Sequence, residues 1–132
     1  MKFARSVLYF EAIFINLLVG LIVFVAPAFF VSSFYPDRLP AVPLEIVRWY
    51  GVLLMVLSYA VLRALPSGNA GAVNILVEAL LFGDVIHFIA TILFFRNGGP
   101  VVFGSVVMVI FTLFLMGVRV FWLRNVRKQA GA

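Results

Sequence analysis

The chain has 132 residues, of which 65% are hydrophobic and only 11% are charged, and its net charge is +5. Soluble domains carry about 25% charged residues, so this composition excludes a soluble globular protein and predicts that the surrounding solvent is lipid. Cysteine is absent, which excludes disulfides, thiolate metal sites and thiol redox chemistry. The basic residues lie at segment ends, where anionic lipid headgroups are the expected partner and nucleic acid is not.

Four apolar segments each approach the roughly 20 residues that a membrane-spanning helix needs. In chain order we expect helices over about 6–30, 44–65, 72–95 and 101–123. The joints between them are rich in helix breakers and read SSFYPDRLPAVP, PSGNAG and RNGGP. Short joints make successive helices antiparallel. The sequence therefore predicts one all-α domain over 1–132, an integral membrane, up-down bundle of four transmembrane helices.

The joints also predict how the helices begin and end. Pro43 suits the first position of the second helix, where its missing N–H is no loss. The Gly98-Gly99-Pro100 run should end the third helix and permit a tight reversal. The joint over 32–44 is the longest, and we expect it to cover the outer mouth of the bundle, as a plain surface loop or as a lid.

Lysine and arginine are distributed unevenly between the two predicted sides. Six lie with the termini, namely Lys2, Arg5, Arg63, Arg124, Arg127 and Lys128, whereas three lie opposite, namely Arg38, Arg48 and Arg96. Because cytoplasmic loops carry the excess of basic residues, both termini should be cytoplasmic. The compact chain and short joints favour a bacterial inner membrane.

Several polar side chains nevertheless fall inside the predicted spans. They are Glu11, Asn16, Arg48, Asn74, Glu78, Asp84, His87, Thr91 and Arg119. A charged side chain at mid-membrane costs at least ~2.5–3.5 kcal/mol on insertion scales, and such residues usually face the interior of a helix bundle. We therefore take this set as the source of candidate functional residues.

Asp84, His87 and Thr91 are spaced i, i+3, i+7 and so share one helix face. Glu78 lies about half a turn from His87 in projection, so the two cannot serve one small site. The Asp84–His87 pair has two interpretations. A low dielectric disfavours the charged form of both groups, so that they can exchange protons near neutral pH in general acid–base chemistry. Alternatively, one hydrogen bond to a neighbouring helix sets the register of the bundle.

Other residues have predicted packing roles. Ala79, Gly83 and Ala90 form a small-residue stripe that suits close helix approach. Asn16 and Asn74 are expected to make hydrogen bonds between helices.

Three charged groups, Glu11, Glu78 and Arg119, lie at one depth. One carboxylate paired with Arg119 would largely neutralise this layer, and the sequence leaves open which of the two it is. For Arg48 the simplest partner is Glu45, three residues earlier.

Motifs that would define a known chemistry are missing from the sequence. It contains no G-x-x-x-x-G-K, no nucleophile elbow and no H-E-x-x-H. One histidine with scattered acids gives a weak metal site, so we predict no metal and no cofactor. The fifteen phenylalanines are expected to face lipid, although they could also line a pocket for a lipophilic ligand.

Three runs carry a resemblance to a known family. They are Ala26-Pro27-x-x-Phe30, Glu45-x-x-Arg48-x-Tyr50-Gly51 and Asn97-Gly98-Gly99-Pro100. Together they resemble a family of small bacterial four-helix membrane proteins of unknown function. The Asp84–His87 pair departs from that pattern. More loosely, Glu11, the Gly83-Asp84-x-x-His87 run and Arg119 are similar to uncharacterised fungal four-helix membrane proteins, and the shape to DoxX-like proteins. The resemblance implies a fold.

These observations lead to a functional hypothesis. By analogy with membrane-embedded isomerases and cyclases, we expect binding of a lipophilic small molecule with acid–base chemistry at intramembrane carboxylates. The predicted catalytic residues are Asp84, His87, Glu78 and Glu11. The predicted substrate-binding residues are Arg48, Asn16, Tyr50, Thr91 and Arg119. The partners would be the lipid bilayer and that molecule, with self-association left open. The alternatives are a non-enzymatic scaffold or accessory subunit, and then a small proton-coupled carrier.

Overall fold

The structure is a computed structural model that describes residues 2–34 and 41–130. Within these ranges every regular element is helical. Four helices are long and apolar enough to cross a membrane, over Lys2–Val25, Pro43–Ser67, Ala70–Arg96 and Phe103–Val126. They indicate a membrane protein. Of the predicted loop or lid over 32–44, residues 35–40, with Arg38 among them, lie outside the described residues.

The first span is a continuous helix with three parts: α1 (Lys2–Phe10), the π-helix η1 (Glu11–Leu18) and α2 (Val19–Val25). It ends at Ala26, whose φ of −132° and ψ of 62° are not helical, and α3 (Pro27–Ser32) follows. The break has a local cause, because a proline pushes the residue before it out of the α region. The helix expected over 6–30 therefore begins earlier and is interrupted before Pro27.

The other spans follow the expected order. They are α4 (Ala41–Ala64) with the short 3₁₀ turn η2 (Leu65–Ser67), α5 (Ala70–Arg96) and α6 (Phe103–Ala130). Pro43 is the third residue of α4, where a missing N–H is still without cost. The Ala72 N–H donates to Asn69 Oδ1 at 3.0 Å and so caps the start of α5. Gly98, with φ of 84°, ends it as expected.

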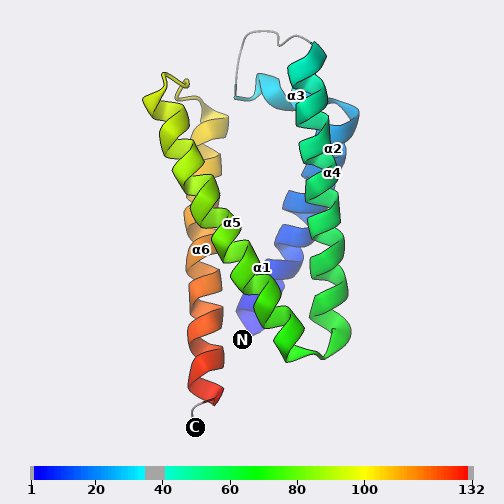
Figure 1. Ribbon diagram of the computed structural model, residues 1–132, viewed down its shortest axis with the longest axis vertical. Helices are drawn as coiled ribbons and strands as arrows, with labels where there is room; N and C mark the ends of the chain where they lie inside the picture. Colours follow the sequence, from blue (N-terminus) through cyan, green and yellow to red (C-terminus); the bar gives the residue numbers. More distant parts are fainter. Residues whose placement is uncertain (1, 35–40, 131–132) are drawn as a thin grey trace.

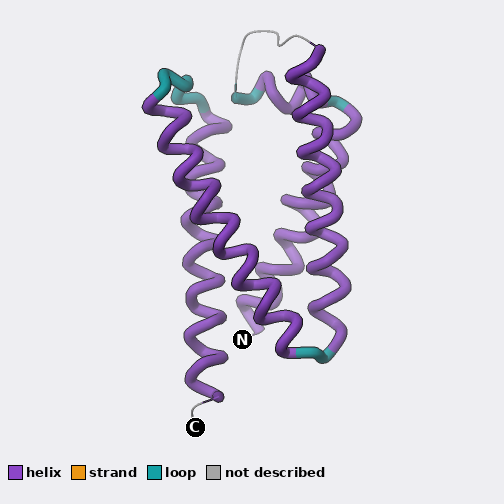
Figure 2. Tube along the Cα trace, viewed as in Figure 1, coloured by secondary structure: helices purple, strands orange, loops and turns teal. Residues whose placement is uncertain are grey.

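The helices form two packed pairs that meet near the termini. The η1–α2 segment packs along α4, and α5 packs along α6. Successive spans run antiparallel, and both termini lie at one end, called here the terminal end (Figure 1). The pairs are joined there by contacts of α1 with α6 and of α4 with α5. Away from the termini, α5 and α6 diverge from α2 and α4 (Figure 2).

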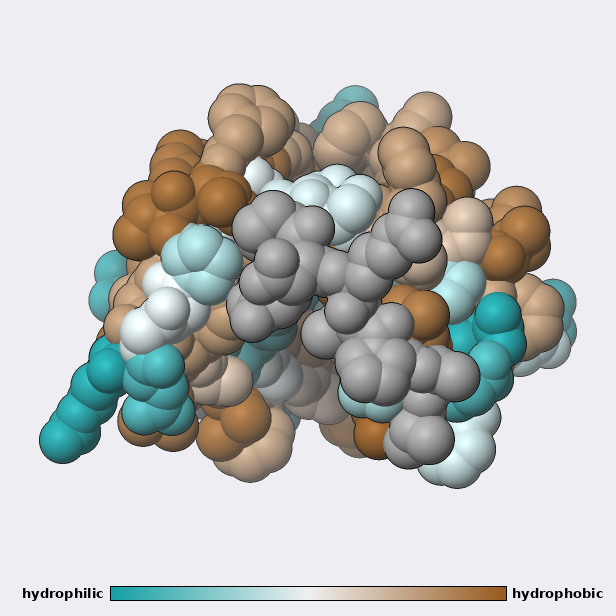
Figure 3. Space-filling model, turned by 90° about the horizontal axis from the view of Figure 1, so that it is seen from above, coloured by the Kyte–Doolittle hydropathy of each residue, from teal (hydrophilic) through white to brown (hydrophobic). Residues whose placement is uncertain are grey.

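The hydrophobic core lies at the terminal end. Its buried members are Ala4, Leu8, Ala12, Val61, Leu65, Val73, Val77, Leu80, Val118 and Trp122. Large apolar side chains elsewhere are often exposed, as Phe29, Phe82 and Phe103 are. Viewed from the opposite end, the molecule shows hydrophobic side chains along most of its rim and hydrophilic ones in a few separate groups (Figure 3).

A close approach of two helices, α2 and α4, uses glycines that the predicted stripe did not include. A Cβ added to Gly51 on α4 would lie 2.7 Å from the Gly20 carbonyl oxygen on α2, so only glycine fits. The predicted stripe of Ala79, Gly83 and Ala90 is wrong, because all three residues are exposed. A Cβ on Gly83 would meet nothing within 4 Å.

Candidate functional site

Arg119 on α6 is the most deeply buried charged group of the described chain, with 1% of its surface exposed. Its Nη2 donates to Glu11 Oε1 of η1 at 2.5 Å. Its Nη1 forms an ion pair with Asp84 Oδ2 of α5, without the geometry of a regular hydrogen bond. Glu11, Asp84 and Arg119, called here the Arg119 cluster, thus connect three helices.

The position of Arg119 follows from the inward face of α6. The buried residues of that helix include Thr112, Leu115, Val118, Arg119 and Trp122, which share one face of the helix at about 100° per residue. Because Arg119 falls in this series, its long side chain extends into the bundle towards η1 and α5. The guanidinium presents several N–H groups in one plane and can bind a carboxylate on each side.

Glu11 reaches the cluster from an unusual helix segment. Glu11 and Asn16 are both buried, with 4% of each surface exposed. In an α-helix, residues five apart would lie about 140° apart around the axis. In a π-helix the hydrogen bonds join residues i and i+5 and bring such residues to nearly the same side. This π-helical segment was not predicted from the sequence, although two polar residues five apart in an apolar run are a signal for it.

Charge in the cluster is unbalanced, since two carboxyl groups face one guanidinium. Several of its buried polar atoms also have no hydrogen-bond partner among the described residues, including Glu11 Oε2 and Arg119 Nε. Asn16 Nδ2, on the same π-helix, also has no hydrogen-bond partner among the described residues. An unpaired charge in a low dielectric is strongly disfavoured. The arrangement can therefore hold one proton on either carboxyl group.

The predicted Asp84–His87 couple is arranged differently from the expectation. In the described part of the chain, no hydrogen bond joins the Asp84 carboxyl to the His87 imidazole, and Asp84 pairs with Arg119 instead. His87 is half-buried one turn further along the same face. Thr91 is buried, and its hydroxyl donates to the His87 carbonyl oxygen at 2.9 Å, within its own helix.

The structure shows which of the two glutamates, Glu11 or Glu78, pairs with Arg119. Glu11 is the partner. Glu78 is exposed on α5, because it lies about 120° from Asp84 around the helix axis. Of the four predicted catalytic residues, the structure therefore brings Glu11 and Asp84 together, places His87 beside them along α5, and leaves Glu78 outside.

Arg48 and Tyr50, two predicted substrate-binding residues, lie on α4 away from the cluster contacts. Arg48 forms the expected ion pair with Glu45, which confirms that prediction. Its Nε also donates to the Phe24 carbonyl oxygen at 2.9 Å, next to the break before Pro27. A cation at a helix C-terminus satisfies the last carbonyls, so Arg48 caps α2. Tyr50 is exposed.

A second polar contact joins α5 and α6 at the terminal end. Trp122 Nε1 donates to Asn74 Oδ1 at 3.0 Å, which confirms the predicted role of Asn74. Beside it lies a pocket of about 240 Å³. Its lining residues include Arg5, Asn69, Asn74 and Trp122. Arg5 also donates to the Leu65 carbonyl oxygen.

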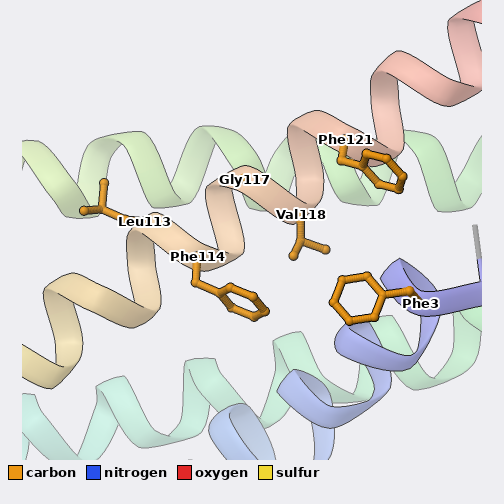
Figure 4. Close-up of a pocket in the computed structure, with 6 residues that line it drawn as sticks. All are labelled: Phe3, Leu113, Phe114, Gly117, Val118 and Phe121. Carbon is orange, nitrogen blue, oxygen red and sulfur yellow. The ribbon is translucent and has the colours of Figure 1, made fainter.

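A larger, apolar groove of about 370 Å³ lies between α1 and α6 (Figure 4). Neither this groove nor the polar pocket is lined by Asp84 or His87. Over the described ranges, no group of three or more His, Asp or Glu side chains is placed to hold a metal ion.

Comparison with known proteins adds no relative. The sequence matches no family model, and no curated protein and no solved structure is significantly similar to it. The resemblance to small bacterial four-helix membrane proteins, to fungal ones and to DoxX-like proteins therefore stays a prediction. The Arg119 cluster is accordingly interpreted from its own geometry.

Proposed function

We propose that this chain is an integral membrane protein that binds a lipophilic small molecule and exchanges a proton with it at the Arg119 cluster. Four helices of spanning length and apolar composition support the membrane location. The excess of lysine and arginine at the terminal end supports cytoplasmic termini. A bacterial inner membrane is the proposed setting.

The observation that carries the proposal is the unequal number of buried carboxyl groups and guanidinium groups. Arg119 can neutralise one carboxylate, and in a low dielectric the other retains a proton. A neutral carboxylic acid beside a carboxylate is a pair suited to acid–base chemistry, as in sites where environment separates the roles of two acids. Arg119 holds both groups in position.

The chemistry that fits such a pair is the isomerisation of a carbon–carbon double bond. The protonated carboxyl group transfers its proton to one carbon of the double bond, which forms a C–H bond and leaves a carbocation. The carboxylate then removes a proton from the carbon on the far side, and the double bond forms at the new position. The pair ends with one proton, as it began, so no oxidant or co-reactant is needed.

His87 and Thr91 extend the polar face of α5 beyond Asp84 into the half of the molecule where the helix pairs diverge. We propose that the lipophilic molecule reaches the cluster along this polar face of α5. His87, half-buried one turn from Asp84, would relay protons to the cluster. The roles of Arg48 and Tyr50 in binding rest on the sequence hypothesis alone.

The test is whether an apolar molecule accompanies the protein because of the cluster. Full-length protein would be purified in lipid nanodiscs and extracted with organic solvent, and the extract analysed by mass spectrometry. We expect wild type to carry an apolar molecule that Asp84→Asn loses or retains unconverted. Thr112→Val is the matched control. It removes a buried hydroxyl of α6 that, among the described residues, donates only to the Met108 carbonyl oxygen of its own helix, at 2.9 Å. The same apolar molecule in the same amount and chemical form from wild type and Asp84→Asn would overturn the proposal.

A second candidate is a non-enzymatic scaffold or accessory subunit. It is favoured by the interhelical polar contacts, because each of them can be explained by helix packing alone. Besides the Arg119 cluster, Ser58 on α4 donates to the Ala12 carbonyl oxygen of η1 at 2.6 Å, and Trp122 donates to Asn74. On this alternative, Asp84→Asn lowers stability in detergent and changes no bound molecule.

A further inference from the structure

We propose that the groove between α1 and α6 binds a phospholipid with an anionic headgroup, one acyl chain lying in the groove and the phosphate beside basic residues at the terminal end. This inference rests on the membrane location in the proposed function. It is independent of any chemistry at the Arg119 cluster, because none of the cluster residues lines the groove.

The groove is apolar along its length. It is lined by Phe3, Leu113, Phe114, Gly117, Val118 and Phe121. The Phe3 ring of α1 faces Phe114 and Val118 of α6, and Phe121 follows towards the terminal end (Figure 4). From Leu113 to Phe121 the groove runs about 12 Å along the axis of α6, at 1.5 Å per residue. An acyl chain lying parallel to the helix fits this shape.

Gly117 creates the space in the middle of the groove. A Cβ added there would meet nothing within 4 Å. Glycine in the interior of a helix costs about 0.5–1 kcal/mol relative to alanine, so its presence needs a reason. No described atom of another helix would lie within 4 Å of that Cβ, in contrast to the close contact of Gly20 with Gly51. The missing side chain instead leaves a recess that lipid can fill.

Basic residues adjoin the end of the groove nearest the termini. Lys2 directly precedes Phe3, and Arg124 and Lys128 follow Phe121 by three and seven residues, on one face of α6. All three side chains are exposed, and none is in an ion pair with another described side chain. Clusters of lysine and arginine next to a membrane segment attract anionic headgroups. This charge selects an anionic lipid over a zwitterionic one.

The experiment measures which lipid stays with the protein. Full-length protein would be reconstituted in liposomes of equal phosphatidylglycerol and phosphatidylcholine, extracted in mild detergent, and its retained lipid quantified by mass spectrometry. We expect wild type to retain phosphatidylglycerol several-fold over phosphatidylcholine. Gly117→Leu should lose most of that lipid, because leucine fills the recess without meeting protein atoms and is a better helix former.

Two further variants make the test specific. Gly83→Leu is the matched control, since Gly83 is also helical with open space around it but does not line the groove, and it should retain the lipid. The triple variant Lys2→Gln, Arg124→Gln, Lys128→Gln should lose the preference for phosphatidylglycerol. It leaves the groove intact, so it tests the inference even if Gly117→Leu does not fold.

Three outcomes would overturn the inference. Gly117→Leu could retain as much phosphatidylglycerol as wild type, or wild type could retain both lipids equally. Alternatively, Gly117→Leu could convert a dimer to a monomer on size exclusion without losing lipid, which would make a second copy of the chain the occupant. Asp84→Asn should retain phosphatidylglycerol in this experiment. A failure of the acid–base proposal can therefore be distinguished from a failure of the lipid-binding inference.

Discussion

Glu11 and Asn16 face the same side of the first span although they are five positions apart, because the segment that contains them is a π-helix. Both are buried, at 4% exposure each. A regular α-helix would turn one of them towards the bilayer and would leave a polar group in lipid. The change of helix type thus puts Asn16 on the buried side of the span together with Glu11, which pairs with Arg119, and π-helical segments are frequent at functional sites.

Removing Arg119 should be the most damaging single change to a charged side chain. Arg119→Gln leaves the Glu11 and Asp84 carboxyl groups buried without a cation, and breaking a buried ion pair costs about 3–5 kcal/mol. Thermal unfolding in detergent measures the loss. The control is Arg63→Gln, an exposed arginine of α4, which should leave the midpoint nearly unchanged. Equal midpoints for both variants would mean that the cluster contributes nothing to stability.

The two carboxyl groups should compensate for each other. Glu11→Gln leaves the Asp84–Arg119 pair, and Asp84→Asn leaves the Glu11–Arg119 pair, so each single variant keeps a neutral pair. The double variant leaves Arg119 charged and alone. We expect its loss of unfolding free energy to exceed the sum of the single losses by about 0.5–3 kcal/mol, the range for residues in one network. A double-mutant cycle measures this difference, and strictly additive losses would refute the shared arginine.

The contact of Gly20 with Gly51 should not tolerate a methyl group. In Gly51→Ala the new Cβ would lie 2.7 Å from the Gly20 carbonyl oxygen and 2.8 Å from the Phe24 nitrogen, both backbone atoms. Overpacking of this kind costs about 1–3 kcal/mol. Gly83→Ala, at an open helical position, should instead gain about 0.5–1 kcal/mol. The measurement is the shift of the unfolding midpoint relative to wild type, which should be negative for Gly51→Ala and positive for Gly83→Ala. A stabilising Gly51→Ala would be inconsistent with this packing.

The two tryptophans should respond differently to replacement by phenylalanine. Trp122→Phe removes the donor to Asn74 Oδ1 and should cost about 1 kcal/mol or more, because the acceptor stays partly buried. Trp49 is 68% exposed, so Trp49→Phe should cost little. Chemical unfolding of both variants, followed by far-ultraviolet circular dichroism, provides the measurement, and equal costs for the two would exclude a role for the hydrogen bond.

Local interactions were predictable from the sequence. The Glu45–Arg48 pair is three residues apart on one helix, and such spacing places side chains next to each other in any helix. The end of α5 at Asn97-Gly98 follows from the preference of glycine for positive φ. Asn74 could be assigned an interhelical hydrogen bond because a buried amide needs a partner. The first two features depend on neighbours within a few residues, whereas the partner of Asn74 is 48 residues away.

The partners of Arg119 were not predictable in this way. Glu11 is 108 residues away in the chain, and the sequence offered Glu78 as an equal alternative. Asp84 was assigned to His87, with which it shares a helix face, and it pairs with Arg119 from another helix instead. Which of two carboxylates meets a given arginine depends on how the helices rotate and pack, and spacing along one helix carries no information about that.

Sequence alone determined four helices of spanning length, their order and most of their boundaries, since the length of an apolar run and its breakers are local properties. Only the tertiary structure decided which face of each helix points inward, and with it the Arg119 cluster, the Gly20–Gly51 contact and the groove at Gly117. The reason is physical. In a helix that is apolar on every side, hydrophobicity does not distinguish the inner face from the outer one, so orientation is set by packing and by the few polar groups.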